Sequence, residues 1–130
     1  MDMEKKTIAL IEDNKILSEA IGEAITAAGF NVITASNGEA GLKLVWEKNP
    51  DLVLLDVAMP VMDGFTALTK LKESSKSKGI PVIMLTVLSQ ESDIKEGDKR
   101  GASGYIVKSE HSTQQVVDEI KGFFAKQDEK

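Results

Sequence analysis

The chain has 130 residues, a length typical of one compact domain, and carries a formal net charge of −5. It has no cysteine and one histidine, which excludes disulfides, thiolate metal sites and zinc sites built from several histidines. The negative charge argues against direct nucleic-acid binding. Since residues 1–6 lack an apolar signal core and no apolar run approaches the ~20 residues that cross a bilayer, we expect a cytoplasmic protein without a membrane segment.

Four short apolar runs predict buried strands, at residues 8–11, 52–55, 82–85 and 105–107. None of them alternates polar with apolar residues. Continuous runs of this kind are typical of strands in a parallel sheet that is covered by helices on both faces. Residues 31–35 predict a fifth, weaker strand.

Helical spacing of apolar residues predicts helices between these strands. Gly29 is expected to end the first helix, whose apolar stripe consists of Ile16, Leu17, Ala20, Ile21, Ala24, Ile25 and Ala28. Ser36 and Glu39 read as a capping box, with Ser36 as the N-cap of a second helix that runs to about Asn49. Trp46, near the end of that helix, is interpreted as a partly exposed packing residue.

The second half of the chain repeats the pattern. Asp63 and Gly64 are expected to open a third helix, with Phe65, Leu68 and Leu71 on its apolar side. A polar fourth helix is expected near residues 89–100, weakened by Gly97. A second capping box at residues 112–115 starts a last helix, which is expected to bury Val116, Val117, Ile120, Phe123 and Phe124.

Strict alternation of strand and helix predicts an α/β fold, a doubly wound parallel sheet of five strands with five helices on its two faces. We expect one domain over residues 1–130, with a core from about 7 to 124. Because only a few polar residues follow the last helix, we expect no output domain.

Polar side chains follow four of the strands at the point where each ends: Glu12 and Asp13, Asp56, Thr86, and Lys108. Because the carboxyl ends of parallel strands share one edge of the sheet, we expect these groups to converge in one cleft, where open α/β folds bind ligands. A single Asp after a strand is usually only a turn residue. The joint pattern of four strand ends is what predicts a functional site.

Three carboxylates in one cleft repel one another and stay ionised together only beside a compensating cation. Their hard oxygen ligands favour Mg²⁺, which commonly shares its shell with phosphate oxygens. Asp56 directly follows the apolar run at residues 52–55 and is expected to lie centrally in the cleft. It is therefore the best candidate for a nucleophile that accepts a phosphoryl group. Lys108 and Thr86 would supply the cation and the donor groups for the phosphoryl oxygens.

Three segments resemble response-regulator receiver domains: Ile8-Ala9-Leu10-Ile11-Glu12-Asp13-Asn14, the stretch from Leu54 to Gly64 with its Asp-x-x-Met-Pro-x-Met-Asp-Gly string, and the stretch from Gly101 to Lys108. The likeness extends from about Thr7 to Phe124. It implies the strand order 2-1-3-4-5 and phosphotransfer from a histidine kinase or a phosphotransfer protein onto Asp56. The implied protein is a signalling phosphoacceptor rather than an enzyme, catalysing only its own phosphorylation and dephosphorylation.

The resemblance also implies roles for individual residues. Mg²⁺ would bind Asp13, Asp56 and the main-chain carbonyl of Ala58, with Glu12 nearby through water. Thr86 and Lys108 would hold the phosphoryl oxygens. Tyr105 matches the switch aromatic, which turns inward when Thr86 moves toward the phosphate and so alters the surface that binds a downstream protein effector. We expect a monomer or weak dimer.

Three positions depart from the family pattern. Val87 stands where Ala, Gly or Ser is preferred, and its branched side chain could crowd the site. Ser109 follows Lys108 where proline in a cis peptide is common, which leaves the state of that bond open. Ala58 is small and apolar where longer polar residues can contact attacking water.

Other functions fit less well. A degenerate receiver, which would bind partners without phosphorylation, is supported only by Val87 and Ser109. An aspartyl-phosphate phosphatase usually has an Asp-x-Asp motif after its first strand, and a flavodoxin needs a Thr/Ser/Gly-rich loop there; this chain has neither. His111 is interpreted as a solvated residue before the last helix rather than a phosphorelay histidine.

Overall fold

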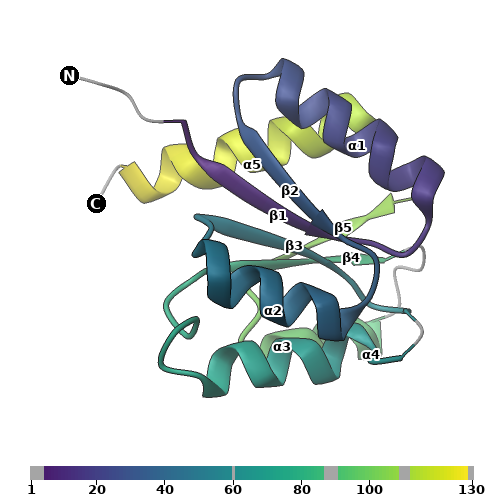
Figure 1. The fold of residues 1–130 in the computed structure, drawn as a ribbon, viewed down its shortest axis with the longest axis vertical. Coiled ribbons are helices and arrows are strands. Elements are labelled where there is room, and N and C mark those ends of the chain that lie inside the picture. The colour runs from purple at the N-terminus through teal and green to yellow at the C-terminus, as the bar shows by residue number, and fades with distance from the viewer. Residues whose placement is uncertain (1–4, 60, 87–90, 109–111, 129–130) are drawn as a thin grey trace.

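The computed structural model describes residues 5–59, 61–86, 91–108 and 112–128. Five parallel strands form one sheet in the order β2-β1-β3-β4-β5, which confirms the expected order (Figure 1). The predicted runs coincide with the strands to within one residue at each end. The strands are β1 (Thr7–Ile11), β2 (Asn31–Ala35), β3 (Leu52–Asp56), β4 (Val82–Thr86) and β5 (Gly104–Val107).

Five helices cover the sheet. In Figure 1, α1 and α5 lie on one face, and α2, α3 and α4 lie on the other. The helices are α1 (Lys15–Ala27), α2 (Gly38–Lys48), α3 (Gly64–Glu73), α4 (Glu91–Arg100) and α5 (Thr113–Asp128). No helix in the described ranges is long and apolar enough to cross a membrane.

The sheet separates two apolar clusters, and β3 contributes alternately to both. Leu54 packs among the residues of α1 and α5, whereas its neighbour Leu55 packs among those of α2 and α3. Every residue of β3 is buried. This explains the continuous apolar run in the sequence, since a strand covered on both faces has no polar side.

The strand register places the carboxyl ends of the central strands side by side. Ile11 is opposite Leu55, Asp56 is opposite Leu85, and Thr86 is opposite Val107. The residues that immediately follow β1 and β5 therefore lie at the same edge as Asp56 and Thr86.

The helix ends follow the predicted chemistry with one correction. The N-cap of α2 is Asn37, whose side-chain oxygen accepts a hydrogen bond from the Ala40 amide at 2.8 Å, and not Ser36. Asn caps a helix as well as Ser does, and here it occupies the position adjoining the first helical turn. Before α5, Ser112 and Gln115 exchange the two hydrogen bonds of the predicted capping box.

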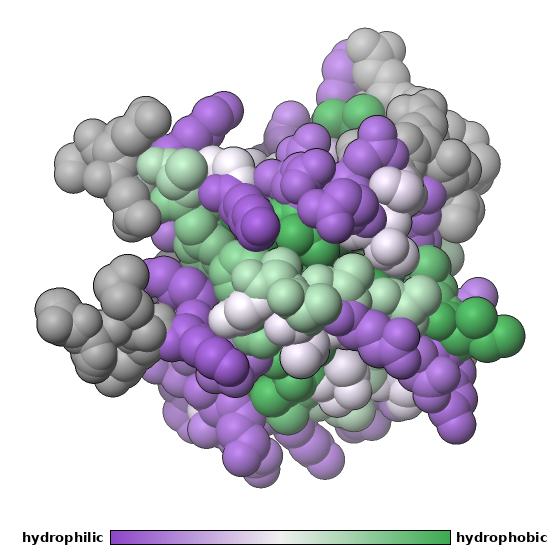
Figure 2. All heavy atoms as spheres, turned by 90° about the horizontal axis from the view of Figure 1, so that it is seen from above, coloured by the Kyte–Doolittle hydropathy of each residue, from purple (hydrophilic) through white to green (hydrophobic). Residues whose placement is uncertain are grey.

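The apolar stripe of α1 is narrower than predicted. Ile21 and Ile25 are buried and Leu17, Ala24 and Ala28 pack beside them, but Ala20 is exposed and Ile16 is 81% exposed. At 3.6 residues per turn, Ile16 lies about 140° around the helix from Ile21, which takes it off the buried face. Figure 2 views the molecule from the side of α1 and α5, where hydrophilic side chains surround a band of more apolar residues.

Candidate functional site

Glu12 and Asp13 follow β1 and differ in their surroundings. The Glu12 amide continues the β1–β2 ladder by donating to the Ala35 carbonyl, and its side chain is buried. One oxygen of its carboxylate accepts a hydrogen bond from the Asn14 amide at 3.1 Å. Asp13 is exposed, so the pair offers one buried and one solvent-facing carboxylate.

Lys108 joins the ends of β1 and β3. Its Nζ lies 2.7 Å from Glu12 Oε1 and 3.2 Å from Asp56 Oδ1. All three side chains are at least nine-tenths buried, and each comes from a different strand end. Two buried carboxylates thus share one ammonium group, and this leaves an excess of negative charge at the centre of the site.

Burial first, and then the negative charge of Glu12, together raise the pKa of Asp56 from 3.8 to about 7. Lys108 opposes this shift. The pKa of Lys108 is itself raised, because the hydrogen bond to Glu12 and the charge of Asp56 outweigh its burial. The site is therefore short of positive charge despite its lysine.

The carboxylates of Glu12, Asp13 and Asp56 together offer oxygen atoms within 4.8 Å of one another, a spacing at which one metal ion could bind them. Hard carboxylate oxygens are the donors that Mg²⁺ prefers. Because three carboxylates cluster here and two of them share the single ammonium group of Lys108, the donor set fits a divalent cation. Ala58, two residues after Asp56, is exposed, and its amide lies 3.4 Å from Asp56 Oδ1.

The loop after β3 is held directly against Asp56 by the start of α3. Asp63 caps α3 through the Thr66 amide at 2.9 Å, and the Gly64 amide donates to the Val57 carbonyl at 2.8 Å. A Cβ atom on Gly64 would lie 2.1 Å from the Asp56 carbonyl oxygen. Sequence reasoning treated Gly64 only as a helix start, although the need for glycine here comes from this close approach.

Another feature of the same loop went unpredicted. Val61 has a φ of 72°, in the left-handed region that β-branched residues rarely adopt, and it is 76% exposed. No sequence pattern indicated this conformation.

Thr86 and Tyr105 lie on neighbouring strands, as predicted. Thr86 is buried at the end of β4. In the β4–β5 register Tyr105 is opposite Met84, which precedes Thr86 by two residues. The Tyr105 hydroxyl is buried, and no group in the described ranges hydrogen-bonds it with good geometry. Burial and the charge of Asp93 raise the pKa of Tyr105, against the influence of the nearby Thr86 side chain.

Three residues of the sequence interpretation, Val87, Ser109 and His111, lie outside the described residues. Trp46 is partly exposed, as expected, and its indole N–H also donates to the buried Ser77 hydroxyl at 3.0 Å.

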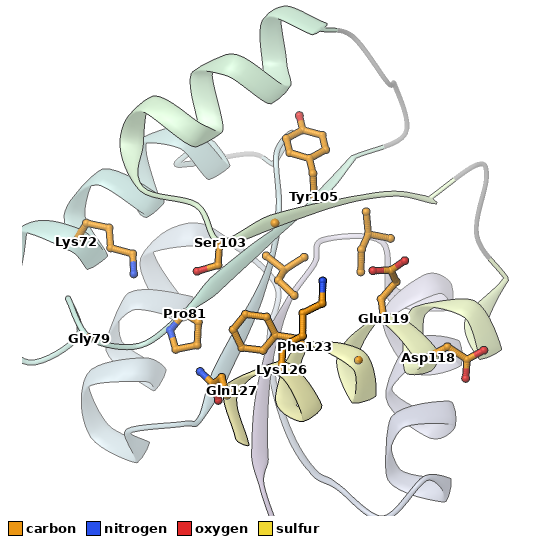
Figure 3. Close-up of a pocket in the computed structure, with 14 residues that line it drawn as sticks. Lys72, Gly79, Pro81, Ser103, Tyr105, Asp118, Glu119, Phe123, Lys126 and Gln127 are labelled. Carbon is orange, nitrogen blue, oxygen red and sulfur yellow. The ribbon is translucent and has the colours of Figure 1, made fainter. Parts of the chain in front are cut away.

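Two surface hollows are each lined by at least one predicted site residue. One of about 710 Å³ lies between α1, the end of β2 and α2, and Glu12 and Asp13 form part of its wall. A second, of about 830 Å³, lies beside β5 and α5 (Figure 3). Among the predicted site residues, only Tyr105 lines the second hollow, so the acidic cluster lies apart from it.

Comparison with known proteins agrees with this geometry. The model of the response regulator receiver domain matches residues 8–121. Among curated proteins, the chain is 37% identical over 102 residues to the transcriptional regulatory protein AfsQ1 of Streptomyces coelicolor, covering 78% of this chain and 44% of that protein. It is 39% identical over 109 residues to the nitrate/nitrite response regulator protein NarL of Escherichia coli, covering 82% and 50%. The chain thus spans about half the length of these relatives.

Solved structures show the same likeness. The chemotaxis protein CheY4 of Vibrio cholerae superposes with a TM-score of 0.86 at 25% identity, covering 91% of this chain and 98% of that one. The phosphorylated cyanobacterial phytochrome response regulator RcpA superposes with a TM-score of 0.76 at 30% identity, covering 92% and 91%. With the family model matching most of its length, the chain belongs to the response regulator receiver domains of two-component signalling.

Proposed function

We propose that this receiver domain accepts a phosphoryl group on Asp56 in a Mg²⁺-dependent reaction, and that the change is passed to a partner protein through Thr86 and Tyr105. One observation carries the proposal. The carboxylates of Glu12, Asp13 and Asp56 and the ammonium group of Lys108 come from three distant segments and meet at one edge of the sheet.

In the proposed transfer, an oxygen of the Asp56 carboxylate attacks phosphorus and forms an acyl phosphate. The bond between phosphorus and the donor atom breaks, and the electron pair leaves with the donor, the imidazole of a phosphohistidine or the carboxylate of a small acyl phosphate. Asp56 must be ionised to attack, and its pKa of about 7 leaves a large protonated fraction near neutral pH.

Mg²⁺ is the cation that the donor set suits, with Asp13, Asp56 and the Ala58 carbonyl as its proposed protein ligands and Glu12 nearby. Bound there, it would neutralise carboxylate charge and phosphoryl charge together. Lys108 is already close to Asp56 Oδ1, so it needs only a small shift to contact a phosphoryl oxygen on that atom. Thr86, at the adjacent strand end, is proposed to bind another.

The role that we propose for the domain is that of a signalling phosphoacceptor, whose only chemistry is its own phosphorylation and dephosphorylation. Receiver domains take the phosphoryl group from histidine kinases or phosphotransfer proteins, and one of these is the proposed donor. The proposed receiver of the signal is a protein. AfsQ1 is named as a transcriptional regulatory protein and this chain covers 44% of it, so in a longer protein the partner could be an attached domain.

Incubation with acetyl phosphate tests the proposal. We expect one phosphoryl group per chain in the presence of Mg²⁺, and none after chelation of the metal or in Asp56→Asn. Absence of labelling by acetyl phosphate and by a panel of phosphorylated histidine kinases, from a folded protein in millimolar Mg²⁺, would favour a binding module that works without phosphorylation.

A further inference from the structure

Arg100, the last residue of α4, fastens that helix to α3. Its Nη1 donates to the main-chain carbonyl of Phe65 at 3.2 Å and to the Thr69 hydroxyl at 3.0 Å. Its Nε is paired with the Glu96 carboxylate one turn earlier in α4. The guanidinium group also lies 5.8 Å from the centre of the Phe65 ring. One side chain therefore makes four contacts, three of them to α3.

Arg100 joins two helices, and each of them contacts a residue of the proposed function: α3 contacts Asp56 and α4 contacts Tyr105. The N-terminus of α3 rests on Asp56, through the close approach of Gly64. Within α4, Gly97 stands one turn before Arg100 and lies against Tyr105: a Cβ atom on Gly97 would be 3.5 Å from Cε2 of the ring. Figure 3 shows Tyr105 projecting from β5 on the side opposite Phe123 and Glu119 of α5.

We propose that Arg100 is a positioning residue of the switch: it holds the end of α4 on α3, so that Gly97 stays beside the Tyr105 ring and keeps the ring packed against α4. This inference deepens the proposed function, since the signalling role of Tyr105 belongs to that function. The contact between Gly97 and Tyr105 exists without a phosphoryl donor. The inference can therefore be wrong while Asp56 is phosphorylated, and it can be right while Asp56 is not phosphorylated.

The shape of arginine explains why this residue suits the position. A planar guanidinium group directs several N–H donors at fixed angles, so it can bind an α3 carbonyl, an α3 hydroxyl and an α4 carboxylate together. Lysine offers a single ammonium group, which cannot reach all three from the same backbone position. Gly97 and Glu96 precede Arg100 by three and four residues, so all three occupy neighbouring positions on the helix.

Tyr105 is the only tyrosine of the chain, which makes the contact directly measurable. In protein labelled at tyrosine, the ring signals belong to Tyr105 alone, and a nuclear Overhauser effect between the ring and the Gly97 α-protons reports their distance. The measurement needs neither Mg²⁺ nor a phosphoryl donor. Arg100→Ala should lose most of the effect, and Arg100→Lys and Thr69→Val should weaken it.

Lys99→Ala is the matched control, because it removes one positive charge from the exposed neighbouring position of the same helix. It should leave the effect unchanged. Urea unfolding of each variant separates positioning from general stability. An Arg100→Ala protein that is less stable but keeps the full Tyr105–Gly97 effect would overturn the inference. Should Arg100→Ala not fold, an unchanged effect in both Arg100→Lys and Thr69→Val would overturn it equally.

Discussion

Gly64 approaches the main chain of Asp56 so closely that a Cβ atom on Gly64 would lie 2.1 Å from the Asp56 carbonyl oxygen and 2.8 Å from Val57 Cα. Both obstructing atoms belong to the backbone and cannot rotate aside. Helix α3 therefore begins directly on the strand end that carries the proposed phosphoacceptor, and any displacement of one displaces the other.

Gly64→Ala should therefore destabilise the protein by about 3 kcal/mol and reduce labelling of Asp56, because α3 must move away from β3 to admit the methyl group. Urea unfolding and acetyl phosphate labelling check the two effects. Gly122→Ala is the control: its Cβ would meet nothing within 4 Å, and alanine in α5 should stabilise by about 1 kcal/mol. An unaltered stability of Gly64→Ala would mean that the loop after β3 yields easily.

The pH dependence of stability should carry the signature of Asp56. Its pKa is about 7 in the folded protein against an ordinary value of 3.8, so the folded state holds the proton more tightly. In metal-free buffer the free energy of unfolding should thus fall as pH rises from about 4 to 7, by at most ~4 kcal/mol from this group. Asp56→Asn should flatten the curve in this window and be the more stable protein at pH 8. Parallel curves for the two proteins would contradict the raised pKa.

Lys108→Met should separate metal binding from phosphorylation. The ammonium group of Lys108 pairs with Glu12 and Asp56, two of the carboxylates proposed to attract Mg²⁺, and it repels the cation. Its removal should therefore tighten Mg²⁺ binding by about tenfold, or ~1.4 kcal/mol. Labelling by acetyl phosphate should nevertheless slow by about 100-fold, because a donor to the phosphoryl oxygens is lost. Lys121→Met, which removes an exposed charge from α5, should change neither quantity. Weaker Mg²⁺ binding in Lys108→Met would show that Lys108 organises the carboxylates rather than competing for them.

The backbone of Val61 is expected to be strained, so a substitution at this position should stabilise the protein. Its φ of 72° disfavours a β-branched side chain, and an exposed fraction of 76% leaves it little packing to lose. Val61→Asn should raise the free energy of unfolding by about 1 kcal/mol, since asparagine tolerates this region. Val61→Gly should gain less because glycine adds freedom to the unfolded chain. Thermal and urea unfolding would refute the idea if Val61→Asn were less stable than the parent.

Much of the fold was predictable because its signals are local. Buried strands such as residues 52–55 have no polar side, so they stand out in the sequence, and α/β alternation then fixes a parallel sheet. The meeting of Glu12, Asp56 and Lys108 was predictable too, since parallel strands must end at one edge. The strand order itself came from the family resemblance.

The remaining features depend on contacts that a sequence pattern does not encode. The exposure of Ile16 depends on which part of α1 meets the sheet, and its apolar residue type alone wrongly placed it on the buried stripe. Ser36 and Asn37 are both good caps, and only the path of the chain after β2 selects Asn37. Arg100 reaches residues 31 and 35 positions away, a separation at which helical spacing says nothing.

The central claim is that Asp56 is the phosphoacceptor, and locating the phosphoryl group tests it most directly. Protein phosphorylated in Mg²⁺ is treated with borohydride, which reduces an aspartyl phosphate to homoserine, and its peptides are sequenced by mass spectrometry. We expect homoserine at position 56 alone, in an amount that matches the phosphoryl group incorporated, and none in protein treated without Mg²⁺. Homoserine at Asp13 or another carboxylate, with Asp56 unmodified, would contradict the account.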